Sequence, residues 1–357
     1  MKVDERPIEQ LRLSICIATY NRGKFIAETL DSILMQIGSG VELIVVDGAS
    51  LDDTPDVMAR YVSKYPQVHY FREEVNSGVD ADFDKAVSYA NGEFCWLMTD
   101  DDLLASDAVS VVLASLNSEN DLLVINSELR NLDLSVTYEK QRLPLNADKE
   151  YRKEDNEIFF ADTASYLSFI GCVVIRRSAW LSRNRLAYYG TLFIHVGVIF
   201  QTPPILNVKV LAKPLVIIRY GNAMWTPRGF EIWMFKWPKL IWSFPDFSDA
   251  AKRKVNQFEP WHEAFKLFYY RALGAYNSNE FRRLWPRDTG KVERITAYLL
   301  SIFPASLANF LFVLYFSTRA KQSEMVMHDF LYARSSGVLT RMLANVLHLE
   351  KYQPKCH

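Results

Sequence analysis

The chain of 357 residues has few of the features that mark secreted, disulfide-bonded or phosphate-loop proteins. Its four cysteines form no CxxC pair, and three of them (Cys16, Cys95 and Cys172, but not Cys356) lie in apolar runs. This predicts structural thiols in a reducing compartment rather than disulfides or zinc ligands. The N-terminal segment MKVDERPIEQLR lacks an apolar stretch, so we expect no secretion signal and a cytoplasmic activity. A glycine-rich phosphate loop with a following basic residue is also missing, which disfavours a nucleotidyltransferase.

Charge is distributed unevenly along the chain. Residues 1–208 contain 19 Lys/Arg and 31 Asp/Glu, whereas residues 209–357 contain 22 and 11, although the net charge is only −1. Hydrophobic residues make up 49% of the chain, enough for a sizeable core and about two domains. The basic second part could meet nucleic acid, an acidic partner or anionic lipid, and its charge does not discriminate among these.

Strand and helix patterns alternate through the first 120 residues. Short apolar runs at 13–19 and 41–47 predict strands that are buried on two faces, and a third and a fourth strand are predicted near 68–72 and at 93–98. Apolar residues recur at helical spacing between these strands. Such alternation predicts an α/β fold with a doubly wound, mostly parallel sheet. Residues 127–160 are polar and predict loops, whereas apolar character returns at 169–177 and 210–220.

The most informative motif is TDDD, Thr99 to Asp102, which follows the fourth predicted strand. Adjacent carboxylates repel one another unless a cation lies between them. Mg²⁺ and Mn²⁺ take oxygen ligands and share their coordination shell with substrate phosphates. The run therefore predicts a divalent metal site, and the alternative is a solvated acidic turn that caps a helix.

Three further loops follow the predicted strands, where ligands bind in doubly wound sheets. Asp47 ends the second strand and can accept a hydrogen bond from a nucleobase. TYNR, which ends the first strand, offers a ring and an amide for a base, and Gly78 allows a ligand to approach the backbone. Each loop, taken alone, is also compatible with an ordinary turn.

Together these motifs resemble the inverting nucleotide-sugar glycosyltransferases of family 2, which have the GT-A fold. The resemblance runs through LSICIATYNRGKFIAETLDSIL, ELIVVDGASLDDT and NSGVDADFDKAVSYANGEFCWLMTDDDLL, within residues 11–225. It implies a Mn²⁺ or Mg²⁺ cofactor with Asp101 and Asp102 as metal ligands, although Thr99 stands where the family has its first aspartate. It implies that the nucleotide-sugar donor is bound by Thr19, Tyr20, Asn21, Arg22, Asp47, Asn76, Gly78 and Asp100.

The second half of this domain departs from the family pattern, because the usual Glu-Asp pair that carries the general base is missing. The corresponding segment, YYGTLFIHVGVIF, followed by KPLVIIRYGN, resembles the abequosyltransferase-type enzymes of O-antigen assembly. In this segment His195 is the candidate catalytic base, because its pKa lies near neutrality. A metal ligand and a structural hydrogen bond are the alternatives for His195. Arg219 and Asn222 are assigned to the diphosphate or the acceptor, or else to a strand-end turn.

From Trp225 onwards aromatic and basic residues interleave, which predicts a mainly helical second domain over 226–357. Residues 295–316 carry no charge and are long enough to span a bilayer, with Lys291, Arg294, Arg319 and Lys321 as basic flanks. The segment 230–244 mixes Trp with Lys, as interfacial segments do. We expect this region to associate with anionic lipids at the cytoplasmic face of the inner membrane, peripherally or monotopically. The alternative is a helical subdomain packed on itself.

The combined prediction is a metal-dependent glycosyltransferase that moves a sugar from a nucleotide-sugar donor to a lipid-linked, polyprenyl-diphosphate saccharide during bacterial surface-polysaccharide assembly. One alternative is transfer to polyprenyl phosphate itself. Another is a non-catalytic nucleotide-binding scaffold with the same fold. No nucleic-acid partner is expected, because no recognised binding motif accompanies the basic charge.

Overall fold

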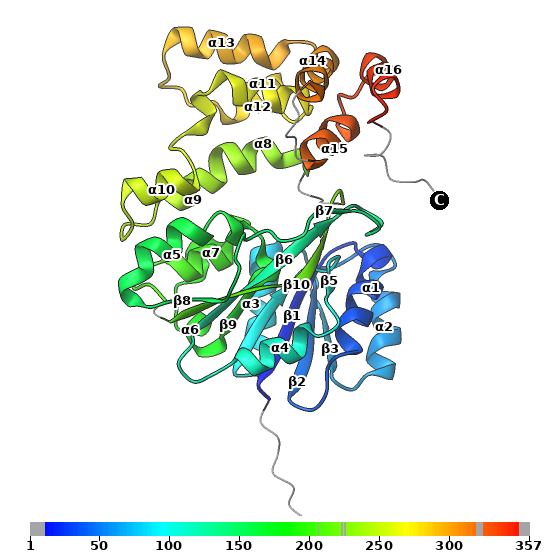
Figure 1. Cartoon of the computed structure of the whole chain (residues 1–357), viewed down its shortest axis with the longest axis vertical. Coiled ribbons are helices and arrows are strands. Elements are labelled where there is room, and N and C mark those ends of the chain that lie inside the picture. The colour runs from blue at the N-terminus through cyan, green and yellow to red at the C-terminus, as the bar shows by residue number, and fades with distance from the viewer. Residues whose placement is uncertain (1–10, 206, 223, 225, 319–323, 350–357) are drawn as a thin grey trace, which may run out of the picture. The chain divides into compact units, whose positions relative to one another are not determined.

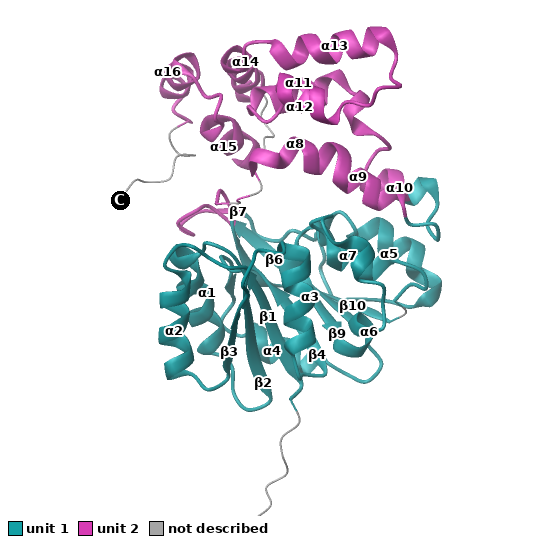
Figure 2. Ribbon diagram, turned by 180° about the vertical axis from the view of Figure 1, so that it is seen from behind, with its two compact units in different colours: residues 1–129, 139–219, 244–251 teal, residues 130–138, 220–243, 252–357 magenta. Residues whose placement is uncertain are grey.

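A computed structural model describes residues 11–205, 207–222, 224, 226–318 and 324–349 (Figure 1). Trp225, Arg319, Lys321 and Cys356, which the sequence analysis names, lie outside the described residues. The chain forms two compact units, each assembled from several segments (Figure 2). Unit 1 comprises residues 1–129, 139–219 and 244–251, and unit 2 comprises residues 130–138, 220–243 and 252–357.

Unit 1 is built on a mixed, mostly parallel sheet, as the sequence predicts. Its strands run in the order β3-β2-β1-β4-β9-β6-β10-β5, and β8 pairs with β10. The first four are parallel, β1 pairing with β2 and β4, and β2 with β3, whereas β9 runs antiparallel to β4 and β6. The strands are β1 (Leu13–Thr19), β2 (Val41–Asp47), β3 (Val68–Arg72), β4 (Phe94–Met98), β5 (Leu103–Leu104), β6 (Leu122–Arg130), β7 (Thr137–Glu139), β8 (Lys149–Tyr151), β9 (Val173–Arg176) and β10 (Val208–Arg219).

Helices cover both faces of the parallel part of this sheet. Alternate residues of β1 point to opposite faces, and Leu13, Ile15 and Ile17 pack in one apolar core with side chains of α1, α2 and α4. Helix α3 packs against β1 and β2. The helices of unit 1 are α1 (Gly23–Leu34), α2 (Thr54–Lys64), α3 (Val79–Tyr89), α4 (Ala108–Ser115), α5 (Asn156–Thr163), α6 (Arg177–Leu181) and α7 (Ile194–Phe200).

The prediction of loops over 127–160 is wrong in part, because β6 continues to Arg130 and α5 begins at Asn156. The polar residue Asn126 is fully buried in β6. Its amide nitrogen donates to Leu143 O at 2.8 Å and Ala212 O at 2.9 Å, and its side-chain oxygen accepts from Leu143 N. The buried amide of Asn126 is therefore tolerated in this strand, because its polar atoms are hydrogen-bonded to backbone groups of the protein.

Unit 2 is mainly helical, as predicted for the second part of the chain. Phe230 and Met234, from the predicted interfacial segment, pack with Trp261 and Tyr276 in an internal cluster rather than forming an exposed aromatic face. Its helices are α8 (Gly229–Glu231), which continues through a π-helical turn (Ile232–Lys236) into α9 (Trp237–Trp242), then α11 (Ala264–Ala272), α12 (Ser278–Leu284), α13 (Lys291–Ile302), α14 (Ala305–Ser317), α15 (Glu324–Tyr332) and α16 (Val338–Val346), while α10 (Asp249–Val255) straddles the two units.

The long uncharged segment 295–316 forms two helices instead of one. Helices α13 and α14 meet at an angle of 92° across a short break that contains Pro304. Within the described residues no single helix is long and apolar enough to cross a membrane, and this bent pair passes that test only when both helices are taken together.

Candidate active site

The acidic run lies at the carboxyl edge of the parallel strands. Strand β4 ends at Met98 and lies beside β1, so the segments that follow these two strands meet. The Arg22 guanidinium, from the end of the TYNR motif, approaches Asp100 Oδ1 at 3.3 Å and Asp101 Oδ2 at 3.2 Å. Both aspartates are only 8% exposed. Two carboxylates therefore converge on one positive group.

A second arginine organises the same edge from β10. The Arg219 side chain donates to the backbone oxygen of Asp101 at 3.0 Å, and its backbone N–H donates to Asp102 Oδ1 at 2.7 Å. Its guanidinium also pairs with Glu28 of α1. The two guanidinium groups of Arg22 and Arg219 lie 5.7 Å and 5.5 Å from the ring centroid of Phe25. Cation–π attraction at these distances helps to hold both arginines beside the carboxylates.

The electrostatics of the acidic run agree with a site that accepts positive charge. Burial, and then the charge of Asp101, raise the pKa of Asp100 to about 7 despite the neighbouring Arg22. Burial and Asp101 also raise the pKa of Asp102 well above its ordinary value. An additional cation would relieve this repulsion.

The side chains of the acidic run are suited to a divalent metal in company with a diphosphate. Mg²⁺ is commonly held by one or two carboxylates together with substrate phosphates, and Asp100 and Asp101 offer such a pair. Among the described residues no group of three or more His, Cys, Asp or Glu side chains forms a self-sufficient metal site. Asp102, predicted as a ligand, instead accepts from Thr99 Oγ1 at 2.5 Å and from Arg219 N. Its place in a metal shell stays a prediction.

Asp47 is fully buried where β2 ends. Its carboxylate accepts from Ser50 N at 2.8 Å and from the Tyr70 hydroxyl at 2.5 Å. Ser50 Oγ in turn accepts from Asn21 N at 2.8 Å. Asp47 thus holds the loop after β2, and Ser50 connects this loop to the TYNR segment. These contacts are all within the protein, and the nucleobase contact predicted for Asp47 stays a prediction.

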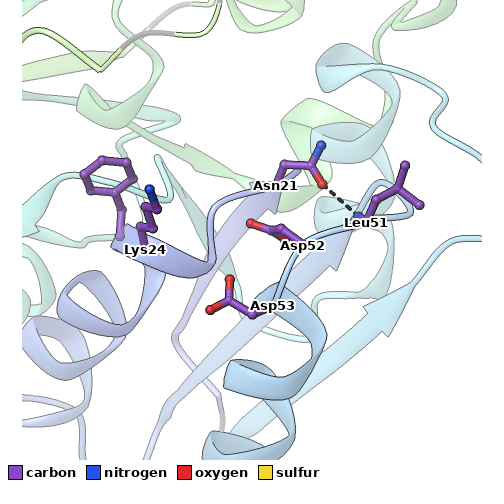
Figure 3. Close-up of a pocket in the computed structure, with 6 residues that line it drawn as sticks. Asn21, Lys24, Leu51, Asp52 and Asp53 are labelled. Carbon is purple, nitrogen blue, oxygen red and sulfur yellow. Dashed lines mark hydrogen bonds between the residues drawn. The ribbon is translucent and has the colours of Figure 1, made fainter.

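A hollow of about 500 Å³ lies between the segments that follow β1 and β2 (Figure 3). Across one side of it, Asn21 Oδ1 accepts a hydrogen bond from Leu51 N at 2.7 Å. Nearby, Asp52 Oδ2 accepts from Gly23 N at 3.0 Å, which ties the two segments together at the start of α1. The sequence analysis predicted only one of the lining residues, which are Asn21, Lys24, Phe25, Leu51, Asp52 and Asp53.

The predicted donor loop around Asn76 approaches the same edge. A Cβ atom added to Gly48, next to Asp47, would lie 3.6 Å from the Asn76 side chain. Asn76 Oδ1 accepts from Gly78 N at 2.9 Å, and Gly78 has a φ of +89°, a conformation that suits glycine. The structure therefore brings this loop next to the end of β2. Thr19 is buried and Tyr20 half-buried at the end of β1, whereas Asn222 belongs to unit 2.

His195 is 1% exposed in the short helix α7. Its Nε2–H donates to Leu167 O at 2.6 Å, since a carbonyl only accepts, and its buried Nδ1 has no hydrogen-bond partner among the described residues. Burial lowers the pKa of His195 to about 4. These observations favour the structural alternative over a general base.

Asp80 and Asp84 of α3, which the sequence analysis did not single out, position the segment around His195. Asp80 accepts from the backbone N–H groups of Leu192 and Ile194 at 2.8 Å and 3.0 Å, and so holds the first turn of α7. Asp84 binds side chains from residues 180–189. The available signal was the acidic DADFD run, in which both carboxylates fall on one helix face.

A sharp test of His195 is its replacement by glutamine, which retains a donor for Leu167 O. Because the folded-state pKa lies below the unfolded value, the unfolded chain binds the additional proton, and wild-type stability is lost as pH falls from about 6.5 to 4. We expect His195→Gln to remove this loss, which amounts to roughly 3 kcal/mol at most, in denaturant titrations at pH 7 and pH 4. We also expect kcat/KM to change less than about tenfold, whereas loss of a general base would cost about a hundredfold or more.

Parallel strands in the order 3-2-1-4, with an acidic run after the fourth, fit the GT-A fold of nucleotide-sugar glycosyltransferases. The solved structure of S. aureus TarS 1–349 in complex with UDP has a TM-score of 0.53, with 16% identity over 96% of this chain and 93% of that one. Residues 14–181 match the family model for glycosyl transferase family 2. Abequosyltransferase RfbV of Salmonella typhimurium is 30% identical over 76% of this chain and 86% of its own length. The chain belongs to glycosyl transferase family 2 and is a glycosyltransferase.

A shorter match covers part of a second relative. The poly(ribitol-phosphate) beta-glucosyltransferase of Bacillus spizizenii is 34% identical over 102 residues, which is 28% of this chain and 16% of that protein. The fold, the family and the enzyme class predicted from the sequence are thus confirmed.

Proposed function

We propose that this protein is a metal-dependent, inverting glycosyltransferase that transfers a sugar from a nucleotide-sugar donor to a polyprenyl-diphosphate-linked saccharide. The observation that carries the proposal is the convergence of Asp100 and Asp101 on a single cation-accepting position at the carboxyl edge of the sheet. The similarity to an abequosyltransferase supports a role in O-antigen or related surface-polysaccharide assembly. We further propose that the enzyme works at the cytoplasmic face of the inner membrane.

We assign the nucleoside and the diphosphate of the donor to two neighbouring parts of unit 1. The hollow between Asn21 and Leu51 is next to the loop fixed by Asp47 and suits the nucleoside, with Lys24 at its edge. Arg22 and Arg219 both lie beside the acidic run, and we assign them to pair with the diphosphate. A divalent cation held by Asp100 and Asp101 would supply charge neutralisation of the leaving diphosphate. An acceptor hydroxyl then attacks the anomeric carbon in line while the bond from that carbon to the nucleoside diphosphate breaks. The hydroxyl proton passes to a general base, the nucleoside diphosphate leaves, and the configuration at the anomeric carbon inverts.

The proposal is tested by a screen of nucleotide sugars with and without Mn²⁺. The cognate donor at a hundredfold excess over its Kd should stabilise the native protein by about 2.7 kcal/mol, which raises Tm by roughly 5 °C. Release of nucleoside diphosphate should depend on the metal and increase with a lipid-linked saccharide. Turnover with bare polyprenyl phosphate would support the alternative acceptor, donor binding without turnover would support a scaffold, and no binding of any donor would contradict the proposal.

A further inference from the structure

Three helices of unit 2 expose apolar stripes at helical spacing. On α13 the exposed side chains follow the pattern i, i+3, i+7, i+10, beginning with Val292, which is 80% exposed. On α16 the stripe ends at Val346, which is 74% exposed. The exposed apolar residues are Val292, Ile295, Leu299 and Ile302 on α13, Leu307, Leu311 and Leu314 on α14, and Val338, Leu339, Met342 and Val346 on α16.

The opposite faces of these helices already form the interior of unit 2. Ala297 is buried on α13, Phe312 and Val313 on α14, and Ala344 on α16. Packing within unit 2 therefore explains the apolar residues on the buried side of each helix but not those on the exposed side. In both ribbon views α13, α14 and α16 lie along one edge of unit 2, away from α8 and α9 (Figures 1 and 2).

The exposed charged side chains on α13, α14 and α16 are basic. Lys291 and Arg294 on α13 and Arg341 on α16 are exposed. The one acidic residue of these three helices, Glu293, is paired with His262. Basic side chains flanking exposed apolar residues complement an anionic bilayer, in which each Lys or Arg near the surface adds to attraction.

The geometry distinguishes lying on a bilayer from crossing it. The 92° bend between α13 and α14 separates two helices of 12 and 13 residues. Asn309 on α14 is fully buried and donates to Ala272 O and Phe330 O at 3.1 Å and 2.8 Å. These bonds hold α14 within unit 2, and insertion across a bilayer would break them.

We infer that the outward stripes of α13, α14 and α16 form a docking surface for an anionic lipid bilayer and lie in its plane. The inference deepens the proposed function, since it places the enzyme at the surface that holds a lipid-linked acceptor. Two exposed tyrosines, Tyr298 on α13 and Tyr315 on α14, add rings of the kind that favour the interface.

The test is flotation of the full chain with vesicles of phosphatidylcholine that contain or lack phosphatidylglycerol. The double substitution Ile295→Ser/Leu299→Ser should lower the partition coefficient for anionic vesicles at least tenfold. Arg294→Gln/Arg341→Gln should weaken binding to anionic vesicles while leaving any binding to neutral ones unchanged. Leu186→Ser, which changes a 73% exposed leucine of unit 1, is the matched control and should bind like wild type.

Equal vesicle binding by wild type and Ile295→Ser/Leu299→Ser would overturn the inference. A second result would also overturn the inference. If wild type does not bind vesicles but is a dimer by light scattering, and Ile295→Ser/Leu299→Ser is a monomer, the surface joins two copies of the chain instead. Metal-dependent hydrolysis of the donor in solution should be the same in wild type and both double variants. If wild type and the variants all fail to hydrolyse the donor while wild type still binds vesicles, the result would contradict the proposed function and leave the docking surface standing.

Discussion

Replacing Asp101 with asparagine is expected to lower kcat/KM by about a thousandfold without destabilising the fold. The substitution retains the side-chain size but removes one of two carboxylates that face Arg22, and electrostatic stabilisation of a leaving diphosphate typically contributes this much. Because the charge of Asp101 raises the pKa of both Asp100 and Asp102, its removal relieves repulsion in the free protein. Unfolding measured alongside activity should therefore give a Tm equal to or above that of wild type.

Asp107→Asn provides the matched control for this experiment. Asp107 is a nearby aspartate, half-exposed, paired with Lys213 at the start of α4, and makes none of the contacts of the acidic run. It should keep kcat/KM within about twofold, as expected for a surface ion pair. An Asp101→Asn enzyme with wild-type activity would rule out a role for this carboxylate in the reaction, and a large fall in Tm would attribute lost activity to misfolding.

Asn309→Ala is expected to destabilise unit 2 by about 4 kcal/mol, because three buried hydrogen bonds are lost together. The amide donates to Ala272 O and Phe330 O, and its oxygen accepts from the Thr340 hydroxyl at 2.7 Å. These bonds connect α11, α14, α15 and α16. Without Asn309 the Phe330 carbonyl and the Thr340 hydroxyl lose these partners in the interior, whereas the Ala272 carbonyl keeps the hydrogen bond from the Ser335 hydroxyl. Hydrogen exchange should show lost protection in these four helices while β1 to β4 of unit 1 keep theirs.

Asn345→Ala, an exposed asparagine on α16, is the control and should change stability by less than about 0.5 kcal/mol. If Asn309→Ala were equally mild, α14 would be held by apolar packing alone. The buried hydrogen bonds of Asn309 would then no longer keep α14 from leaving unit 2 for a bilayer.

The parallel half of the fold was predictable because its signals are local. The four predicted strand segments end at the last residues of β1, β2, β3 and β4. Strands β1, β2 and β4 are buried on both faces and are continuously hydrophobic, whereas β3 lies at the edge of the sheet and is mostly exposed. Strand β6 was not predicted, and its part beyond residue 126 was assigned to loops, because the hydrogen-bond partners of its buried Asn126 come from distant segments. Pro304 within the uncharged segment 295–316 was visible in the sequence, but the 92° angle between α13 and α14 was not.

The candidate site was predictable in its anchors but not in its contacts. The TDDD motif and Asp47 were identified because acidic residues at strand ends are visible in a sequence. The assembly of β1, β4 and β10 determines the contacts. It brings Arg22 to Asp100 and Asp101, and it lets Thr99 and Arg219 donate hydrogen bonds to Asp102. No local pattern carries that information.

The ion pairs of Arg22 have a consequence for the order in which ligands arrive. The free protein carries its own counter-charge for Asp100 and Asp101, and the guanidinium holds both carboxylates while the donor is away. Arg22 gives up these partners at low cost only when a diphosphate offers it new ones. If the proposed function is correct, metal binding at Asp100 and Asp101 and donor binding should therefore be cooperative, and we expect free metal to bind weakly until the donor is present.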